Sequence, residues 1–198
     1  MNIVFDLGGV VFTWEPESII ARIFSDNITR QRARQEIFDH QDWVDLDRGV
    51  LEKETAVTRA VKRTGLSISE VERLFNQIPT SLVLIPSTLE LIKNLKNKGH
   101  RLFVLSNMHK TSIQYLEQEY SFWDVFEGKV ISCRIKMVKP ETKIFRYLLN
   151  RYKLLVEKTV FIDDSATNIQ AASKVGINTI QFKDANQCRQ ELSALGFI

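Results

Sequence analysis

The first twelve residues, MNIVFDLGGVVF, constrain the fold more than any other stretch of the chain. Residues 3–5 form a continuous run of β-branched and aromatic residues, which is typical of a strand buried on both faces of a parallel sheet. The run ends at Asp6, and Gly8 and Gly9 follow, which lets the backbone leave the sheet and pass close to a ligand. Open α/β sheets bind ligands beyond the carboxyl ends of their strands, so Asp6 is expected at a binding edge.

Length, composition and charge narrow the class of protein. A chain of 198 residues can form one α/β domain with an insertion, and 44% hydrophobic and 26% charged residues are ordinary for a soluble globular protein. The net charge of +3 is spread along the chain, which favours a small anionic substrate over nucleic acid. Cys133 and Cys188 form no metal-type pair, and we find no membrane span or signal peptide. We therefore expect reduced thiols in a cytoplasmic protein, and the oligomeric state stays open.

Residues 15–81 carry helical periodicity and little strand signal. Apolar residues recur at helical spacing in four segments, near 19–24, 37–46, 51–61 and 71–75. Gly49 and Gly65 mark breaks, and Ser69 with Glu72 has the spacing of a capping box. Four helices with no strand between them predict a small helical bundle.

From Pro86 onward, helices and strands alternate. We expect strands at 101–105, 129–132, 159–162 and 177–182, separated or followed by helices at 86–98, 111–119, 141–152, 168–174 and 185–195. This alternation implies right-handed crossovers and a parallel sheet covered on both faces. The sequence thus predicts an α/β fold with a Rossmann-like parallel sheet, built from residues 1–14 and 82–198 and interrupted by the helical segment 15–81.

Polar residues of a particular kind follow the predicted strands. They are Asp6, Ser106 with Asn107, Lys139, and Asp163 with Asp164 and, one helical turn on, Asn168. Carboxylates crowded on one rim repel each other, and Mg²⁺, which prefers hard oxygen ligands, removes that repulsion. A lysine, a hydroxyl and the amides of the glycine turn complete a cradle for a phosphoryl group. One carboxylate can then attack phosphorus and form an aspartyl-phosphate.

These segments resemble the motifs of the haloacid dehalogenase-like hydrolases. FDLGGVV resembles the family's nucleophile motif, LFVLSN its second motif, VKPE its lysine motif and FIDDSATNI its acidic motif. The helical segment 15–81 lies where this family inserts a cap. In finer detail the segments are similar to a subgroup of sugar-phosphate phosphatases, that of bacterial α-glucose-1-phosphate phosphatase.

The resemblance implies a role for each residue. Asp6 is expected as nucleophile and metal ligand, with the Gly8 carbonyl and Asp164 as further Mg²⁺ ligands. Ser106 and the Asn107 amide are expected to bind the phosphoryl group, and Lys139 to neutralise charge on it and on the nucleophile. Asp163 is expected to orient the metal site, and Asn168 to support the acidic loop.

One departure from the family pattern concerns proton transfer. Phosphatases of this family usually carry a second Asp two positions after the nucleophile, and here that position is Gly8. General acid–base catalysis is typically worth about 10²–10⁴-fold in rate, so its loss matters. Glu15 and His109 are the candidates to replace it, although a structural or solvent-facing role is the commoner one for such residues.

The resemblance also predicts that the cap selects the substrate by closing over the site. Trp14, Trp43 and the turn Asp47–Arg48–Gly49 are candidates to line the closed pocket, although tryptophans at helical spacing are commonly core residues. The leading hypothesis is a Mg²⁺-dependent phosphatase of small phosphate monoesters, with sugar phosphates as the expected substrates. The alternatives are a metal-independent 2-haloacid dehalogenase with the same nucleophile, which the acidic pair disfavours, and a phosphate-ligand binding protein inactivated by Gly8.

Overall fold

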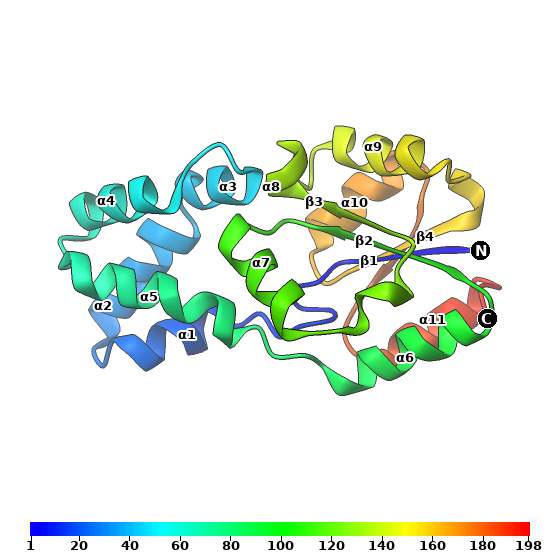
Figure 1. Cartoon of the computed structure of the whole chain (residues 1–198), viewed down its shortest axis with the longest axis horizontal. Coiled ribbons are helices and arrows are strands. Elements are labelled where there is room, and N and C mark those ends of the chain that lie inside the picture. Colours follow the sequence, from blue (N-terminus) through cyan, green and yellow to red (C-terminus); the bar gives the residue numbers. More distant parts are fainter.

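Strand β1 (Asn2–Phe5) occupies the centre of a five-stranded parallel sheet in the computed structural model, which describes all 198 residues (Figure 1). The other strands are β2 (Arg101–Ser106), β3 (Gly128–Ile131), β4 (Thr159–Asp163) and β5 (Asn178–Gln181). The strand order is β3-β2-β1-β4-β5, so the first strand of the chain pairs with β2 on one side and β4 on the other. This arrangement confirms the predicted α/β class.

Helices cover both faces of the sheet because successive side chains of its strands point to opposite sides. Ile3 and Phe5 join one apolar cluster, which includes residues of α6 (Pro86–Asn97), α7 (Lys110–Glu119) and α11 (Ala185–Ala194). Val4 joins a second cluster, to which α9 (Thr142–Tyr152) and α10 (Ala166–Lys174) contribute. All four residues of β1 are buried, as the unbroken apolar run predicts.

The segment between β1 and α6 forms a separate helical unit, which we define as residues 16–81. It contains α1 (Pro16–Ile23), α2 (Asn27–Ala33), a π-helix (Arg34–Phe38), α3 (Gln41–Arg48), α4 (Lys53–Thr64) and α5 (Ile68–Ser81). These elements pack around their own cluster of 14 buried apolar residues. The expected helix near 37–46 is divided, because His40 caps the start of α3 by accepting the Asp42 N–H.

Two glycines end helices in this unit as expected, but one predicted cap is wrong. Gly49 and Gly65 follow α3 and α4 in the left-handed conformation, at φ of 71° and 69°. The capping box of α5 is formed by Ser67 and Glu70, two residues earlier than predicted. Ser69 lies inside the first turn of the helix, so its hydroxyl cannot cap it.

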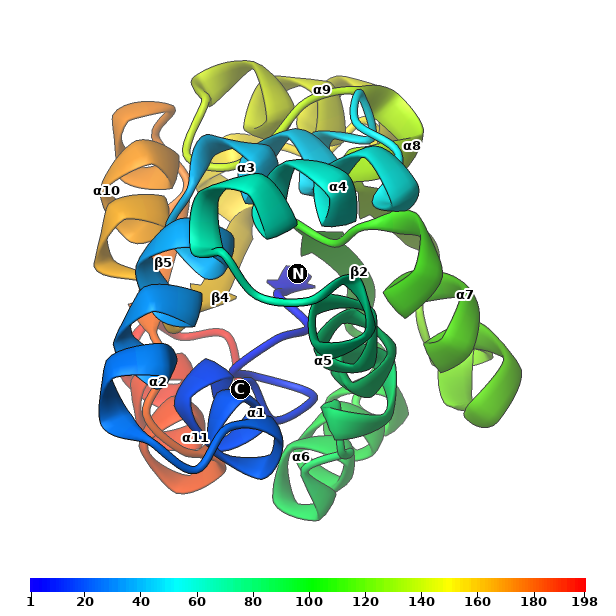
Figure 2. The same cartoon turned by 90° about the vertical axis from the view of Figure 1, so that its left-hand side faces the viewer.

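The helical unit meets the α/β domain at two places, where α3 packs against a short helix, α8 (Ser132–Ile135), and where α5 packs against α7. Figure 2 looks onto this unit and shows α3 close to α8 behind it. The Ser132 hydroxyl and the Lys136 ammonium donate hydrogen bonds to the backbone carbonyls of Asp47 and Gly49. Arg48 forms two hydrogen bonds with Glu141, of 3.0 and 2.8 Å. None of the helices combines the length and apolar character that crossing a membrane requires.

Candidate active site

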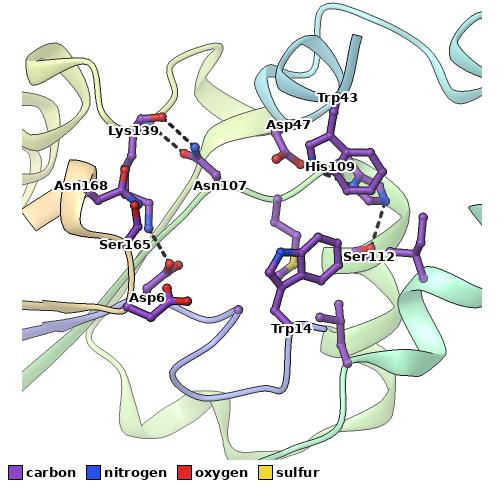
Figure 3. Close-up of a pocket in the computed structure, with 15 residues that line it drawn as sticks. Asp6, Trp14, Trp43, Asp47, Asn107, His109, Ser112, Lys139, Ser165 and Asn168 are labelled. Carbon is purple, nitrogen blue, oxygen red and sulfur yellow. Dashed lines mark hydrogen bonds and ion pairs between the residues drawn. The ribbon is translucent and has the colours of Figure 1, made fainter. Parts of the chain in front are cut away.

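A pocket of about 320 Å³ lies between the carboxyl ends of the strands and the helical unit (Figure 3). Six of the predicted site residues line it, namely Asp6, Gly8, Asn107, Lys139, Asp164 and Asn168. They come from distant parts of the sequence, and they meet here because parallel strands end at one edge of the sheet.

Lys139 lies at the centre of the charged cluster. Its ammonium Nζ is 2.8 Å from Asp6 Oδ2 and 2.6 Å from Asp163 Oδ2, and its side chain is 1% exposed. Burial by itself lowers the pKa of Lys139, but the two carboxylates outweigh burial and raise that pKa. The ammonium is therefore a permanent positive charge beside the predicted nucleophile.

Asp163 is fully buried and already hydrogen-bonded within the protein. Besides the Lys139 ammonium, it accepts the Ser165 N–H at 2.8 Å and the Asn168 amide at 3.0 Å to both of its oxygens. These bonds fix the loop that follows β4 and hold the lysine in place. The orienting roles that the resemblance implies for Asp163 and Asn168 stay predictions.

Asp6 and Asp164 are the carboxylates that remain to bind a cation. With Asp163 they form a cluster whose ligand oxygens all lie within 4.8 Å of one another. Burial is the largest influence on Asp6 and raises its pKa to about 7, against the attraction of Lys139. Burial and the neighbouring Asp163 charge also raise the pKa of Asp164. Three carboxylates this close together, two of them buried and Asp164 open to solvent, fit a divalent cation with oxygen ligands.

The two glycines after Asp6 differ in what they permit. Gly9 has a φ of 76°, and a Cβ atom built there would lie 2.3 Å from Asp164 Oδ2, so only glycine fits beside that carboxylate. At Gly8, a Cβ atom would lie 3.6 Å from the Trp14 Cβ, which is ordinary van der Waals contact. The role of the Gly8 carbonyl as a metal ligand stays a prediction.

Ser106 and Asn107 supply donors at the end of β2. The Ser106 hydroxyl is buried and has no hydrogen-bond partner in the protein, which is costly unless a ligand satisfies it. The Asn107 side chain bonds the backbone N–H and C=O of Lys139, at 2.8 and 2.9 Å. Its side chain therefore positions the lysine, and its backbone N–H is the group left for the predicted contact with a phosphoryl oxygen.

The side of the pocket opposite Asp6 contains a second polar group (Figure 3). His109 lies with Nδ1 3.4 Å from Asp47 Oδ1 and Nε2 3.0 Å from the Ser112 hydroxyl. Trp43 contacts the imidazole edge-on, with ring centroids 5.3 Å apart. Glu15, the other candidate acid, is exposed at the start of α1 and does not line the pocket.

Comparison with known proteins decides the family. A family model described as haloacid dehalogenase-like hydrolase matches residues 1–176. The chain belongs to the haloacid dehalogenase-like hydrolases. This confirms the resemblance found in four separate segments of the sequence, and it establishes that the protein belongs to a hydrolase family.

Relatives within the family match nearly the whole chain. The sesquiterpene phosphatase astK of Aspergillus oryzae is 26% identical over 192 residues, which cover 97% of this chain and 94% of that protein. D-ribitol-5-phosphate phosphatase of Bacteroides thetaiotaomicron is 22% identical, with 98% and 97% covered. A family enzyme from B. thetaiotaomicron, solved with magnesium and inorganic phosphate, shares the fold at a TM-score of 0.75, with 24% identity and with 92% and 94% of the two chains covered.

Five pocket residues were not expected from the sequence. They are Ile78, Leu82, Met108, Ser112 and Ser165. Ser165 directly follows the acidic pair at the N-cap of α10, a position that could have drawn attention to it. The apolar residues carry no such signal, because their spacing is also that of ordinary core positions. Of the candidates to line the closed pocket, Trp14, Trp43 and Asp47 do line it, whereas Gly49 does not and Arg48 is bonded to Glu141 outside it.

Proposed function

We propose that this protein is a Mg²⁺-dependent phosphatase that hydrolyses small phosphate monoesters through an aspartyl-phosphate on Asp6. The proposal rests mainly on the residues that surround the Asp6 carboxylate. Asp6 lies 2.8 Å from a buried lysine, in a cluster with two further carboxylates. The names of the relatives, a sesquiterpene phosphatase and a ribitol-phosphate phosphatase, support phosphoryl transfer as the chemistry.

Asp6, Asp164 and the Gly8 carbonyl would hold the Mg²⁺ ion. When bound, the ion supplies positive charge that neutralises the carboxylates and the phosphate oxygens. The related structure solved with magnesium and inorganic phosphate supports this assignment. The carboxylate cluster of the present chain has the oxygen donors that such an ion requires.

The reaction has two displacement steps at phosphorus. A carboxylate oxygen of Asp6 attacks the phosphorus atom, and the bond to the ester oxygen breaks with its electron pair leaving on that oxygen. Lys139 offsets the negative charge on the nucleophile and the phosphoryl group, and Ser106 and the Asn107 N–H donate hydrogen bonds to phosphoryl oxygens. Water then attacks phosphorus, which releases phosphate and restores the Asp6 carboxylate.

The helical unit would act as a cap that closes the pocket over the substrate. Trp43 and Asp47 bring residues of this unit into the pocket wall, and Arg48 links the unit to Glu141 of the sheet domain. We propose the boundaries predicted from the sequence, with residues 15–81 as the cap and residues 1–14 and 82–198 as the catalytic domain. A cytoplasmic location is part of the same proposal.

The finer prediction, a sugar phosphate as substrate, rests on the resemblance to sugar-phosphate phosphatases and on the ribitol-phosphate relative. The name of the other relative, a sesquiterpene phosphatase, indicates a substrate with a very different organic group. We therefore include both polar and apolar phosphate esters among the substrates to be assayed.

Phosphate release from a panel of phosphate esters, with and without Mg²⁺, tests the proposal. We expect turnover that needs Mg²⁺ and disappears in Asp6→Asn, which keeps the size of the side chain but removes its negative charge. Halide release from 2-haloacids without metal would favour the dehalogenase alternative. A folded protein that binds Mg²⁺ and phosphate without turning over any ester would favour the binding protein, for which Gly8 is the specific observation.

A further inference from the structure

We propose that the pocket is specialised for aryl phosphates, that is, for phosphate esters whose leaving group is a weakly basic, apolar phenolic oxygen. This inference rests on the proposed phosphatase function and names its substrate class. Two independent features support it, the absence of a free side-chain proton donor for the leaving group and the aromatic and aliphatic side chains on one wall of the pocket.

No side chain is placed to protonate the leaving group. Position 8 carries no side chain, and the exposed Glu15 lies outside the pocket. His109 lies on the side of the pocket opposite Asp6, as Figure 3 shows, which is the side toward which a leaving group in line with Asp6 points. Both of its ring nitrogens, however, already face protein groups, Asp47 and Ser112. Asp164 belongs to the carboxylate cluster that would hold the cation. With this arrangement the ester oxygen leaves without a proton from a side chain.

This requirement selects the leaving group. When the bond between phosphorus and the ester oxygen breaks, the electron pair stays on that oxygen, and the departing anion takes its proton from solvent after release. A phenolate, whose conjugate acid has a pKa of about 10 as in tyrosine, carries this charge readily. An alkoxide from an ordinary alcohol is far more basic, so its departure depends on a general acid.

The wall next to position 8 is aromatic. The Trp14 side chain begins beside Gly8, and its ring stacks on Trp43 with centroids 5.8 Å apart and an interplanar angle of 29°. Ile78, Leu82 and Met108 extend this wall with aliphatic and thioether groups. Aromatic rings pack favourably against such a surface.

The polar groups of the far wall are already paired. The imidazole of His109 faces the Asp47 carboxylate at 3.4 Å and the Ser112 hydroxyl at 3.0 Å. A sugar ring placed here would bring several hydroxyls that need partners, and burying a hydroxyl without one is unfavourable. The volume of about 320 Å³ is near the lower limit of small-molecule pockets, roughly 300–1,000 Å³, which suits a single ring.

The structure also allows the missing acid to be restored. A Cβ atom at Gly8 makes only ordinary contact with Trp14, and the backbone there is not in the left-handed region. Gly8→Asp places a carboxyl group two positions after the nucleophile, and Gly8→Ala adds the same Cβ atom without the carboxyl group. The pair separates the effect of an acid from the effect of a larger side chain.

The test compares three esters with the Mg²⁺-loaded full-length protein and measures kcat/KM for each. Phenyl phosphate and cyclohexyl phosphate are similar in size and polarity but differ in the basicity of the leaving group. Glucose 1-phosphate adds hydroxyls, and its hemiacetal leaving oxygen is intermediate in basicity between the other two. We expect the wild type to prefer phenyl over cyclohexyl phosphate by roughly 10²-fold or more, and Gly8→Asp, but not Gly8→Ala, to raise the cyclohexyl-to-phenyl ratio at least about tenfold. We also expect phenyl phosphate to exceed glucose 1-phosphate.

The other possible results refute either this inference or the proposed phosphatase function. Equal kcat/KM for phenyl and cyclohexyl phosphate in the wild type would show that a proton donor acts on the leaving group, which would refute the inference. A preference for glucose 1-phosphate would refute the aryl class and favour sugar phosphates. If a folded, Mg²⁺-loaded protein releases phosphate from none of the three esters or from the wider panel, the proposed phosphatase function fails and this inference fails with it.

Discussion

Replacing Lys139 by methionine is the perturbation whose magnitude the structure defines best. The ammonium is 1% exposed and lies between Asp6 and Asp163, at 2.8 and 2.6 Å. Lys139→Met keeps much of the side-chain volume but leaves two buried carboxylates without their cation. Removing one partner of a buried ion pair typically lowers the free energy of unfolding by about 3–5 kcal/mol. For a chain of this length, that corresponds to a fall in Tm of roughly 6–20 °C.

The loss in the metal-free protein should depend on pH. Burial raises the pKa of Asp6 to about 7 in the folded protein, above the 3.8 that is ordinary for an aspartate in water. A raised folded-state pKa contributes stability that is present at low pH and is lost as pH rises toward and through about 7. Without the Lys139 ammonium the carboxylate is still harder to ionise, so the destabilisation should be larger near pH 8 than near pH 5.

Urea unfolding in the presence of a chelator measures this difference at both pH values. Lys143→Met is a matched control, because Lys143 is 53% exposed and its ion pair with Glu141, at 3.0 Å, lies at the surface. The control should change the free energy of unfolding by at most about 1 kcal/mol. If both variants lose the same small amount, or if Lys139→Met loses no more near pH 8 than near pH 5, the electrostatic reasoning is wrong.

Three further predictions concern the metal and the helical unit. Mg²⁺ should raise Tm more at a pH above about 7 than below it, since protons compete with the ion for Asp6; thermal unfolding with and without Mg²⁺ at the two pH values checks this. Asp42→Ala should lower the free energy of unfolding by about 3 kcal/mol, because Arg59 and Arg63 bond this buried carboxylate at 3.0 and 2.7 Å; urea unfolding measures it, and a loss below about 1 kcal/mol contradicts it. Arg48→Ala should cost at most about 1 kcal/mol but speed hydrogen exchange in α3, because it removes the pair with Glu141; unchanged exchange would show that this pair does not restrain the helix.

The positions of the site residues could be predicted because they follow from topology. Asp6, Ser106 and Asp163 end or directly follow strands that pair in parallel, and parallel strands bring their carboxyl ends together. Lys139 was expected at the same edge because it follows the third predicted strand, but it lies in the loop after β3 and α8, so strand pairing constrains its position less closely. Its distances to Asp6 and Asp163 required the structure.

The helical unit was harder to predict because local sequence permits several solutions. Ser67 with Glu70 and Ser69 with Glu72 both have the spacing of a capping box, and the sequence offers no local reason to prefer either. The structure uses the first pair, and α5 then buries Val71 against the rest of the unit. Val71 lies inside the helix with either start, so the burial pattern of the sequence does not distinguish the two, and only the structure shows where this helix begins.

Contacts across the pocket could not be predicted from the sequence either. His109 was a candidate for the missing acid, and only the structure places it on the side opposite Asp6 with Asp47 and Ser112 as partners. The hydrogen bonds from the Asn107 side chain to the backbone of Lys139 could not be predicted either, because no sequence spacing indicates them. Both contacts join elements that are distant in the chain.

The most direct test of the central claim is chemical trapping of the intermediate. Enzyme turning over a phosphate ester with Mg²⁺ is quenched and treated with borohydride, which reduces an aspartyl-phosphate to homoserine, and the peptide that contains residue 6 is examined by mass spectrometry. We predict homoserine at position 6 in the wild type only when substrate is present, and none in Asp6→Asn. Sustained phosphate release with an unmodified Asp6, or with homoserine at position 163 or 164 instead, would contradict the proposed mechanism.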